Sequence, residues 1–171
     1  MRQINIEIKA RCLAQDKIRD ILKSKNADYK GTDYQIDVYF KINNGRLKLR
    51  KGNIENYLVY YNREDKAGPK QSNVILYETD PKSPIEDILT ESLGVLAIVD
   101  KNREIYFIDN VKFHLDNVKN LGYFVEIEAI DYDGKIGKKK LYEQCKFYMN
   151  LFGIKDDDLI NCSYSDLLLR K

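Results

Sequence analysis

Charged residues recur at every second position in several segments of the chain, and this spacing could bring acids and bases together on one surface. Lysines and arginines that converge are suited to hold a polyphosphate, because each donates charge-assisted hydrogen bonds to phosphate oxygens. Carboxylates beside them would repel that anion unless they held a divalent cation that bridges to it. The segments with this pattern carry Asn5, Glu7, Lys9 and Arg11; Lys48 and Arg50; Arg63; Lys101 and Arg103; Lys112, His114 and Asp116; and Glu126 and Glu128.

These segments alternate polar and apolar residues, as is typical of β-strands, whose successive side chains point to opposite faces. Between Ile4 and Arg11, isoleucines and an alanine occupy one face and polar residues the other. Asn44-Gly45 supplies the positive φ angle that a tight hairpin needs. We predict strands over residues 4–11, 34–41, 46–51, 57–63, 73–79, 97–108, 111–118 and 123–131.

Helical patterns are fewer and fall between the strands. Apolar residues recur at helical spacing over residues 16–25. Ser83-Pro84 and Gly94 bracket a second helix, because serine and proline favour helix starts and glycine favours helix ends. A third helix is predicted over residues 138–152, before Gly153, and a short fourth over residues 163–169.

The charged faces could point either outward to solvent or inward, and the spacing alone allows both arrangements. Their recurrence on six segments with apolar opposite faces favours the inward one. Helices between strands can cover the apolar outside of a closed sheet, which leaves the charged faces to line its bore. We therefore predict an α+β fold, mainly antiparallel β: a closed barrel of about eight strands with helices packed outside.

The bulk composition predicts a globular protein with a single domain over residues 1–171. With 29 Lys and Arg against 27 Asp and Glu, the net charge of +2 gives no support for a nucleic-acid partner, and Lys138-Lys139-Lys140 is expected to face solvent. Three cysteines without a CxxC pair indicate neither a disulfide framework nor a zinc site. No segment resembles a signal peptide or a membrane span, so we expect a cytoplasmic protein with no membrane partner.

Asn5-Ile6-Glu7-Ile8-Lys9 resembles the ExExK signature of the CYTH family, also called triphosphate tunnel metalloenzymes. This family includes class IV adenylate cyclases and thiamine triphosphatases. The ending Tyr164-Ser165-Asp166-Leu167-Leu168 is similar to that of the cyclase-like bacterial branch. Further stretches fit the family in the right order: Gly45–Arg50, Tyr60–Arg63, Gly68–Lys70 with Ser72, Lys101–Arg103, and His114–Asp116 followed by Glu126–Glu128.

The resemblance implies a metal site, a triphosphate site and two catalytic residues. Asp116 would orient or bind metal near the reacting group, and Lys9 would act on the same group. We expect Lys70 and Arg46 to be solvated, and His114 to be a hydrogen-bonded structural residue. The implied ligands of Mg²⁺ or Mn²⁺ are Glu7, Glu126 and Glu128, and the implied triphosphate contacts are Lys9, Lys48, Arg50, Arg63, Lys101 and Arg103.

The implied partner is a nucleoside triphosphate or another triphosphate, and the implied activity is that of a class IV adenylate cyclase, which converts ATP into cyclic AMP and pyrophosphate. A triphosphatase acting on inorganic, thiamine or nucleoside triphosphate needs nearly the same cations and carboxylates. Asn5 departs from the signature, because it stands where the first Glu is expected. The missing carboxylate leaves a non-catalytic polyphosphate or nucleotide binder as a third hypothesis. Similar proteins also lead us to expect a homodimer.

Overall fold

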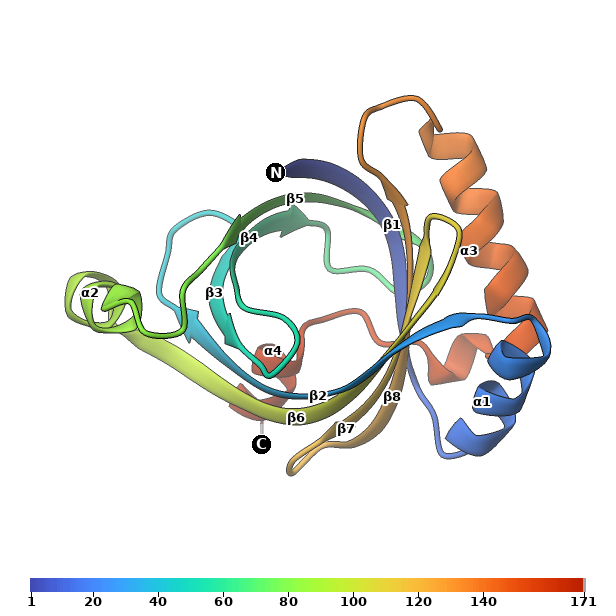
Figure 1. The fold of residues 1–171 in the computed structure, drawn as a ribbon, viewed down its shortest axis with the longest axis horizontal. Helices are drawn as coiled ribbons and strands as arrows, with labels where there is room; N and C mark the ends of the chain where they lie inside the picture. Colours follow the sequence, from blue (N-terminus) through green and yellow to red (C-terminus); the bar gives the residue numbers. More distant parts are fainter. Residues whose placement is uncertain (171) are drawn as a thin grey trace.

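A closed antiparallel barrel forms the centre of the structure, a computed structural model that describes residues 1–170. Within these residues the strands follow one another around the barrel in the order β1-β5-β4-β3-β2-β6-β7-β8 (Figure 1). The predicted fold is therefore confirmed. The strands are β1 (Arg2–Arg11), β2 (Asp28–Phe40), β3 (Arg46–Lys51), β4 (Tyr57–Arg63), β5 (Lys70–Glu78), β6 (Val95–Ile108), β7 (Val111–Val118) and β8 (Gly122–Asp131).

β2 and β5 begin at least three residues earlier than the alternation predicts. β2 starts at Asp28, because residues 28–33 pair with β6 through a register shift at Gly31. β5 starts at Lys70, which lies opposite Glu7 on β1, while Ser72 lies opposite Asn5. These extensions depend on the partner strand and leave no clear pattern in their own sequence.

The helices cover the apolar outside of the barrel on two sides. Figure 1 shows α1 (Gln15–Ser24) and α3 (Lys138–Phe152) against one side, and α2 (Ile85–Leu93) on the opposite side. The α1 and α3 helices enclose a core with the outward residues of β1, β7 and β8, such as Ile8, Phe113 and Ile127. The α2 helix packs its apolar residues over Val38 and Phe40 on β2. Across residues 1–170, no helix has the length and apolar content needed to cross a membrane.

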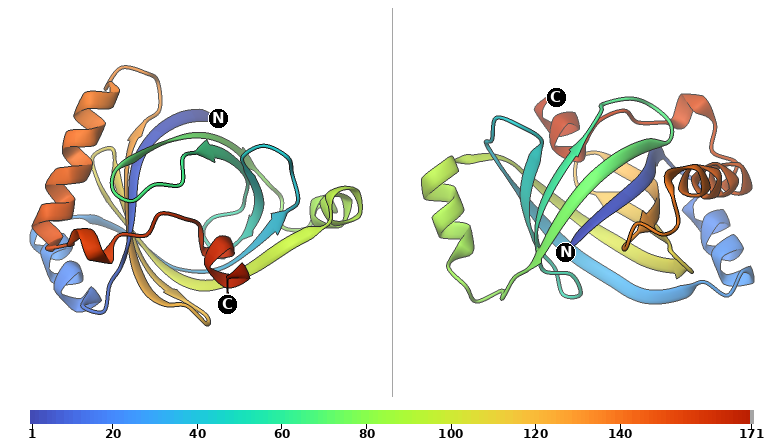
Figure 2. Two further views of the ribbon diagram at one scale, coloured as in Figure 1. Left: turned by 180° about the vertical axis from the view of Figure 1, so that it is seen from behind. Right: turned by 90° about the horizontal axis from the view of Figure 1, so that it is seen from above.

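The C-terminal part of the described chain returns to the barrel. After α3 it passes through a short 3₁₀ turn, η1 (Asp156–Asp158), to α4 (Tyr164–Leu169), which lies across one end of the barrel (Figure 2). Leu159 forms a β-bridge with Ala10, and the Ile160 N–H donates to the carbonyl of Lys9 at 2.8 Å. The C-terminal segment and α4 therefore pack at one end of the barrel (Figure 2).

The loop between β2 and β3 has the glycine that its turn requires. Gly45 has a φ of +70°, and a Cβ atom there would lie 2.8 Å from the carbonyl oxygen of Tyr61. Only glycine adopts this conformation without that contact. The turn places Lys48 and Arg50 on the inner face of β3, opposite Tyr39 and Asp37 of β2.

Candidate active site

A cavity of about 470 Å³ occupies the interior of the barrel, and all eight strands contribute residues to its lining. Its volume falls in the range of roughly 300–1,000 Å³ that is usual for small-molecule sites. The charged alternating faces therefore point inward, and the alternative of a solvated outer face is wrong for them. Arg11 is the exception, since it is exposed and donates to the carbonyl of Leu121.

The lining of the cavity mixes charged residues with apolar and aromatic ones. Tyr57, Leu76, Phe107 and Ile130 are among the apolar and aromatic residues, and Lys112 Nζ lies 5.6 Å from the centre of the Phe107 ring. The predicted site residues in the lining are Glu7, Lys9, Lys48, Arg50, Arg63, Arg103, Glu126 and Glu128. Of the predicted site residues, only Lys101 and Asp116 lie outside the lining.

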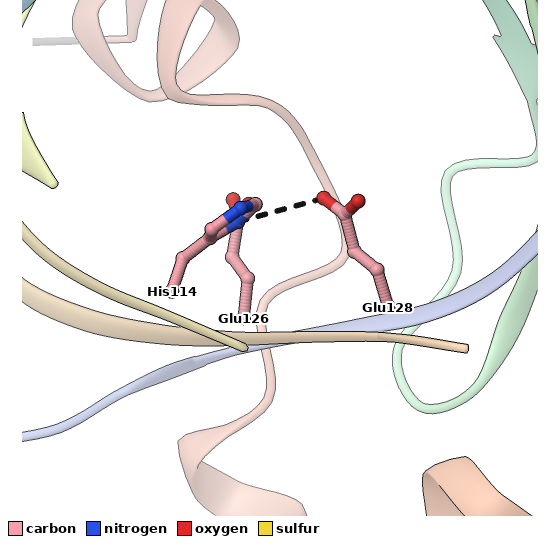
Figure 3. Close-up of side chains that lie close together, drawn as sticks. All are labelled: His114, Glu126 and Glu128. Atoms are coloured by element: carbon pink, nitrogen blue, oxygen red, sulfur yellow. Dashed lines mark hydrogen bonds and ion pairs between the residues drawn. The ribbon is translucent and has the colours of Figure 1, made fainter. Parts of the chain in front are cut away.

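Three side chains from β7 and β8 form an acidic cluster in the cavity (Figure 3). His114 Nδ1 lies 3.2 Å from Glu126 Oε2 and 3.6 Å from Glu128 Oε1. One ligand atom from each of the three lies within 4.8 Å of the others. Carboxylate oxygens and an imidazole nitrogen are a donor set that suits a divalent cation. This cluster is therefore the candidate metal site.

Asn5 and Glu7 border this cluster on β1. The amide Nδ2 of Asn5 donates to Glu128 Oε2 at 3.5 Å, so Asn5 lies beside the cluster without adding charge. Glu7 is the register partner of Glu128, but its carboxylate is engaged in an ion pair with Arg63 of β4. The third carboxylate of the implied ligand set is thus nearby and already neutralised by a cation.

Glu126 joins the acidic cluster to two cations. Lys9 Nζ lies 2.9 Å from Glu126 Oε1, and Arg103 Nη2 donates to Glu126 Oε2 at 3.0 Å. Burial alone would raise the pKa of the Glu126 carboxyl, but the positive charges of Lys9 and Arg103 outweigh burial and hold that pKa well below its usual value. Glu126 is consequently an anion in the folded protein.

Asp116 holds Arg103 in place from behind the cavity wall. Arg103 donates from Nε to Asp116 Oδ1 at 2.7 Å and from Nη2 to Asp116 Oδ2 at 2.5 Å. The hydroxyl of Tyr164, at the start of α4, donates to Asp116 Oδ2 at 2.7 Å. The Tyr164 ring also lies 3.6 Å from Lys9 Nζ, in cation–π geometry. Lys9, Glu126, Arg103, Asp116 and Tyr164 thus form a closed ring of contacts.

Asp37 of β2 is a buried carboxylate that three predicted cations share. It accepts from Lys101 at 2.6 Å, from Lys48 at 2.7 Å and from Arg50 Nε at 3.0 Å. Burial would raise the pKa of Asp37, but Arg50, Lys101 and Lys48 together hold it well below its usual value. Burial lowers the pKa of Lys101 to about 7 despite the opposing charge of Asp37.

Glu55 is a second carboxylate that two cations share, Arg50 and Lys112. It lies in the loop between β3 and β4, accepts from Arg50 Nη1 at 2.8 Å and is ion-paired with Lys112. The cations of the bore are therefore neutralised by carboxylates of the chain itself.

The structure corrects the expectation that Lys70 and Arg46 are solvated. Lys70 is 1% exposed, and its ammonium donates to the carbonyls of Lys66 at 3.0 Å and Ile160 at 3.2 Å. Arg46 Nη2 lies 2.7 Å from carboxylate oxygens of both Asp65 and Asp166. Both cations fasten the C-terminal segment to the barrel, a role that depends on tertiary contacts.

Asp37 and Glu55 should make the protein sensitive to acid. Burial would raise the pKa of Glu55, but the charges of Lys112 and Arg50 hold this pKa well below its usual value. The pKa of Asp37 is likewise held below its usual value. Below about pH 5 the unfolded chain, with carboxyl pKa values of about 4, therefore binds more protons than the folded one, and stability falls as the pH falls. We expect the urea midpoint to decrease steadily from pH 5 to pH 3. A midpoint that stays constant over this range would contradict the assignment.

Comparisons with known proteins agree with this geometry. The sequence profile of the CYTH domain matches residues 3–161. A putative adenylate cyclase of Methanocaldococcus jannaschii is 26% identical, over 96% of this chain and 98% of that protein. A solved structure from Pyrococcus horikoshii has 29% identity and a TM-score of 0.74, over 95% of this chain and 98% of that one. A Hippeastrum structure, titled as a putative adenylyl cyclase with a dominant triphosphatase activity, has 17% identity and a TM-score of 0.62, over 98% and 94% of the two chains.

Proposed function

Because the chain belongs to the CYTH domain family, we propose that its tunnel binds ATP with a divalent cation and converts it into cyclic AMP and pyrophosphate. One observation carries this proposal: a single cavity is lined both by converging cations and by aromatic and apolar side chains such as Tyr57 and Phe107. The cations suit a triphosphate, and the aromatic side chains suit a nucleobase, because bases stack on aromatic rings. Inorganic triphosphate would leave those aromatic side chains without a partner.

The cations that line the cavity are assigned to the triphosphate. They lie on five strands, so together they can surround a chain of phosphates. Each is paired with a carboxylate, so phosphate oxygens would compete with those carboxylates for the same donors. The assigned residues are Lys9, Lys48, Arg50, Arg63 and Arg103, with Lys112 added from the structure.

Lys101 and Asp116 are assigned to positioning. Lys101 lies outside the cavity lining and donates to Asp37, which also accepts from the lining residues Lys48 and Arg50. Asp116 is occupied by Arg103 and the Tyr164 hydroxyl, so we assign it to holding Arg103 and not to taking the proton of the 3′-hydroxyl. These two residues would then affect the reaction without touching the substrate.

The carboxylates of the cluster are assigned to Mg²⁺ or Mn²⁺. Glu126 and Glu128 would hold the cation, and Glu7 would join them when Arg63 turns to a phosphate. A cation held there would supply charge neutralisation to the phosphate oxygens for the in-line displacement in which the 3′-oxygen replaces pyrophosphate at the α-phosphorus. The residues of the chain hold the phosphates in line for that displacement and exclude water from it.

A triphosphatase is the second candidate. The Hippeastrum protein pairs the same fold with a dominant triphosphatase activity. The same cations and carboxylates could hold a triphosphate for attack by water at the γ-phosphorus. The two reactions then differ in which phosphorus faces the attacking oxygen.

The test is to incubate the purified protein with ATP, inorganic triphosphate or thiamine triphosphate, each with Mg²⁺ or Mn²⁺, and to separate the products by chromatography. Cyclic AMP and pyrophosphate from ATP are the expected result. Orthophosphate without a cyclic product would select the triphosphatase. Tight, metal-dependent binding without turnover would overturn both and leave the non-catalytic binder.

A further inference from the structure

We propose that His114 is a ligand of the metal ion and that its imidazole takes the place of the carboxylate missing at Asn5. This inference deepens the proposed function, on which its biological meaning rests. It also predicts the class of cation: a first-row transition metal such as Mn²⁺ in preference to Mg²⁺.

The first step concerns the position of the His114 imidazole relative to the two carboxylates. His114 lies on β7 directly opposite Glu126 on β8, and both side chains point into the cavity together with Glu128 (Figure 3). The separations from Nδ1 to the two carboxylates are 3.2 and 3.6 Å. Adjacent ligands around a divalent cation, each about 2.1 Å from it, lie about 3 Å apart. Nδ1 therefore lies at the spacing of a neighbouring ligand from both carboxylates, and all three donor atoms lie within 4.8 Å of one another.

The second step concerns the other ring nitrogen. His114 is 1% exposed, and its Nε2 has no hydrogen-bond partner among the described residues. A histidine that serves only the fold normally satisfies both ring nitrogens when it is buried. The ring of His114 is instead held on one side only, by the carboxylates of the candidate metal site. The fold alone therefore does not account for both nitrogens of this buried ring.

The third step concerns charge and ligand type. Asn5 lies within reach of Glu128 but offers an amide where a carboxylate would add a negative charge. Glu7, the next carboxylate on β1, is paired with Arg63. A neutral imidazole adds a donor without adding charge, and imidazole suits transition metals, whereas Mg²⁺ takes oxygen ligands. Replacing a carboxylate by an imidazole thus shifts the site away from Mg²⁺.

The chain offers an unusually clean test, because His114 is its only histidine. Protein without a histidine tag is loaded with Mn²⁺, with and without inorganic triphosphate, and examined by electron spin echo envelope modulation. Modulation from an imidazole ¹⁴N is the expected result. In His114→Gln this signal disappears, the Kd for Mn²⁺ rises about tenfold, and the Kd for Mg²⁺ changes much less.

Asn5→Glu provides the matched variant. If His114 compensates for Asn5, restoring the carboxylate raises Mg²⁺ affinity in both the wild-type and the His114→Gln backgrounds. Mn²⁺ bound by the wild-type protein without ¹⁴N modulation overturns the inference, even if His114→Gln fails to fold. Turnover of a triphosphate without that modulation rejects only the role of His114. Modulation without turnover rejects only the proposed reaction.

Discussion

Replacing Asp37 by Asn is expected to lower the free energy of unfolding by about 3–5 kcal/mol. The asparagine would leave Lys48, Arg50 and Lys101 without the carboxylate that they share inside the barrel. A buried charge that loses its partner is far more costly than a broken surface pair. Urea denaturation at pH 7 measures the loss.

Asp100→Asn is the matched control. Asp100 lies on β6, is half exposed and pairs with Lys119 across 3.4 Å. Its replacement should change stability by less than about 0.5 kcal/mol. A similar small effect for Asp37→Asn would mean that the three cations do not depend on Asp37.

Triphosphate should partly repair the Asp37→Asn protein. A ligand that binds only the folded state stabilises it in proportion to the logarithm of its concentration over Kd. Phosphate oxygens would give Lys48 and Arg50 a new partner, so inorganic triphosphate should raise the urea midpoint of the variant more than that of the wild type. Burial lowers the pKa of Lys101 to about 7 although the charge of Asp37 opposes this, so the loss of Asp37 should lower that pKa further, and the deficit should shrink as the pH rises toward 7 and this lysine loses its proton.

Replacing Glu126 by Gln should reduce activity by a factor of about 10²–10³, whichever triphosphate the protein converts. The carboxylate contacts Lys9, Arg103 and His114, and it belongs to the candidate metal site. A neutral amide removes the charge that holds the two cations and weakens the hold on the metal ion. The initial rate of triphosphate consumption measures the effect, with thermal unfolding as a check that the variant is folded.

Glu143→Gln is the control for this substitution. Glu143 is exposed on α3, on the outside of the barrel, and its charge has no role in the proposed reaction. Its activity should equal that of the wild type. If Glu126→Gln kept more than about a tenth of wild-type activity, Glu126 would not hold the metal ion or the reacting phosphate.

The sequence predicted the barrel because the alternation of polar and apolar residues within each strand distinguishes its two faces. The alternation from Ile4 to Arg11 identified the inner face of β1, and Ser83-Pro84 and Gly94 identified α2. The same alternation predicted that Lys48 and Arg50 share one face of their strand, and both line the cavity. Such patterns are local, so they survive without knowledge of the neighbouring strand.

The sequence did not reveal which side chains are buried together and which of them form ion pairs or hydrogen bonds in the folded barrel. Asp37 lies on the inner face of β2 and was not singled out, because alternation does not tell which side chains will share an ion pair. Glu55 lies in a loop, where no periodicity marks an inward side chain. Tyr164 was visible only as part of a terminal motif, and its contact with Asp116 exists only in the folded barrel.

The pairing of β1 with β8 also sets when the site can exist during synthesis. Glu7 lies opposite Glu128 and Lys9 opposite Glu126, so the first strand made must wait for the last strand before either pair can form. Contacts between such distant parts of a chain form slowly. A ribosome-bound chain that lacks β8 therefore carries every lysine and arginine assigned to the triphosphate yet lacks the strand that joins β7 to β1 and closes the barrel. Binding of the ligand would report that the last strand has closed the barrel.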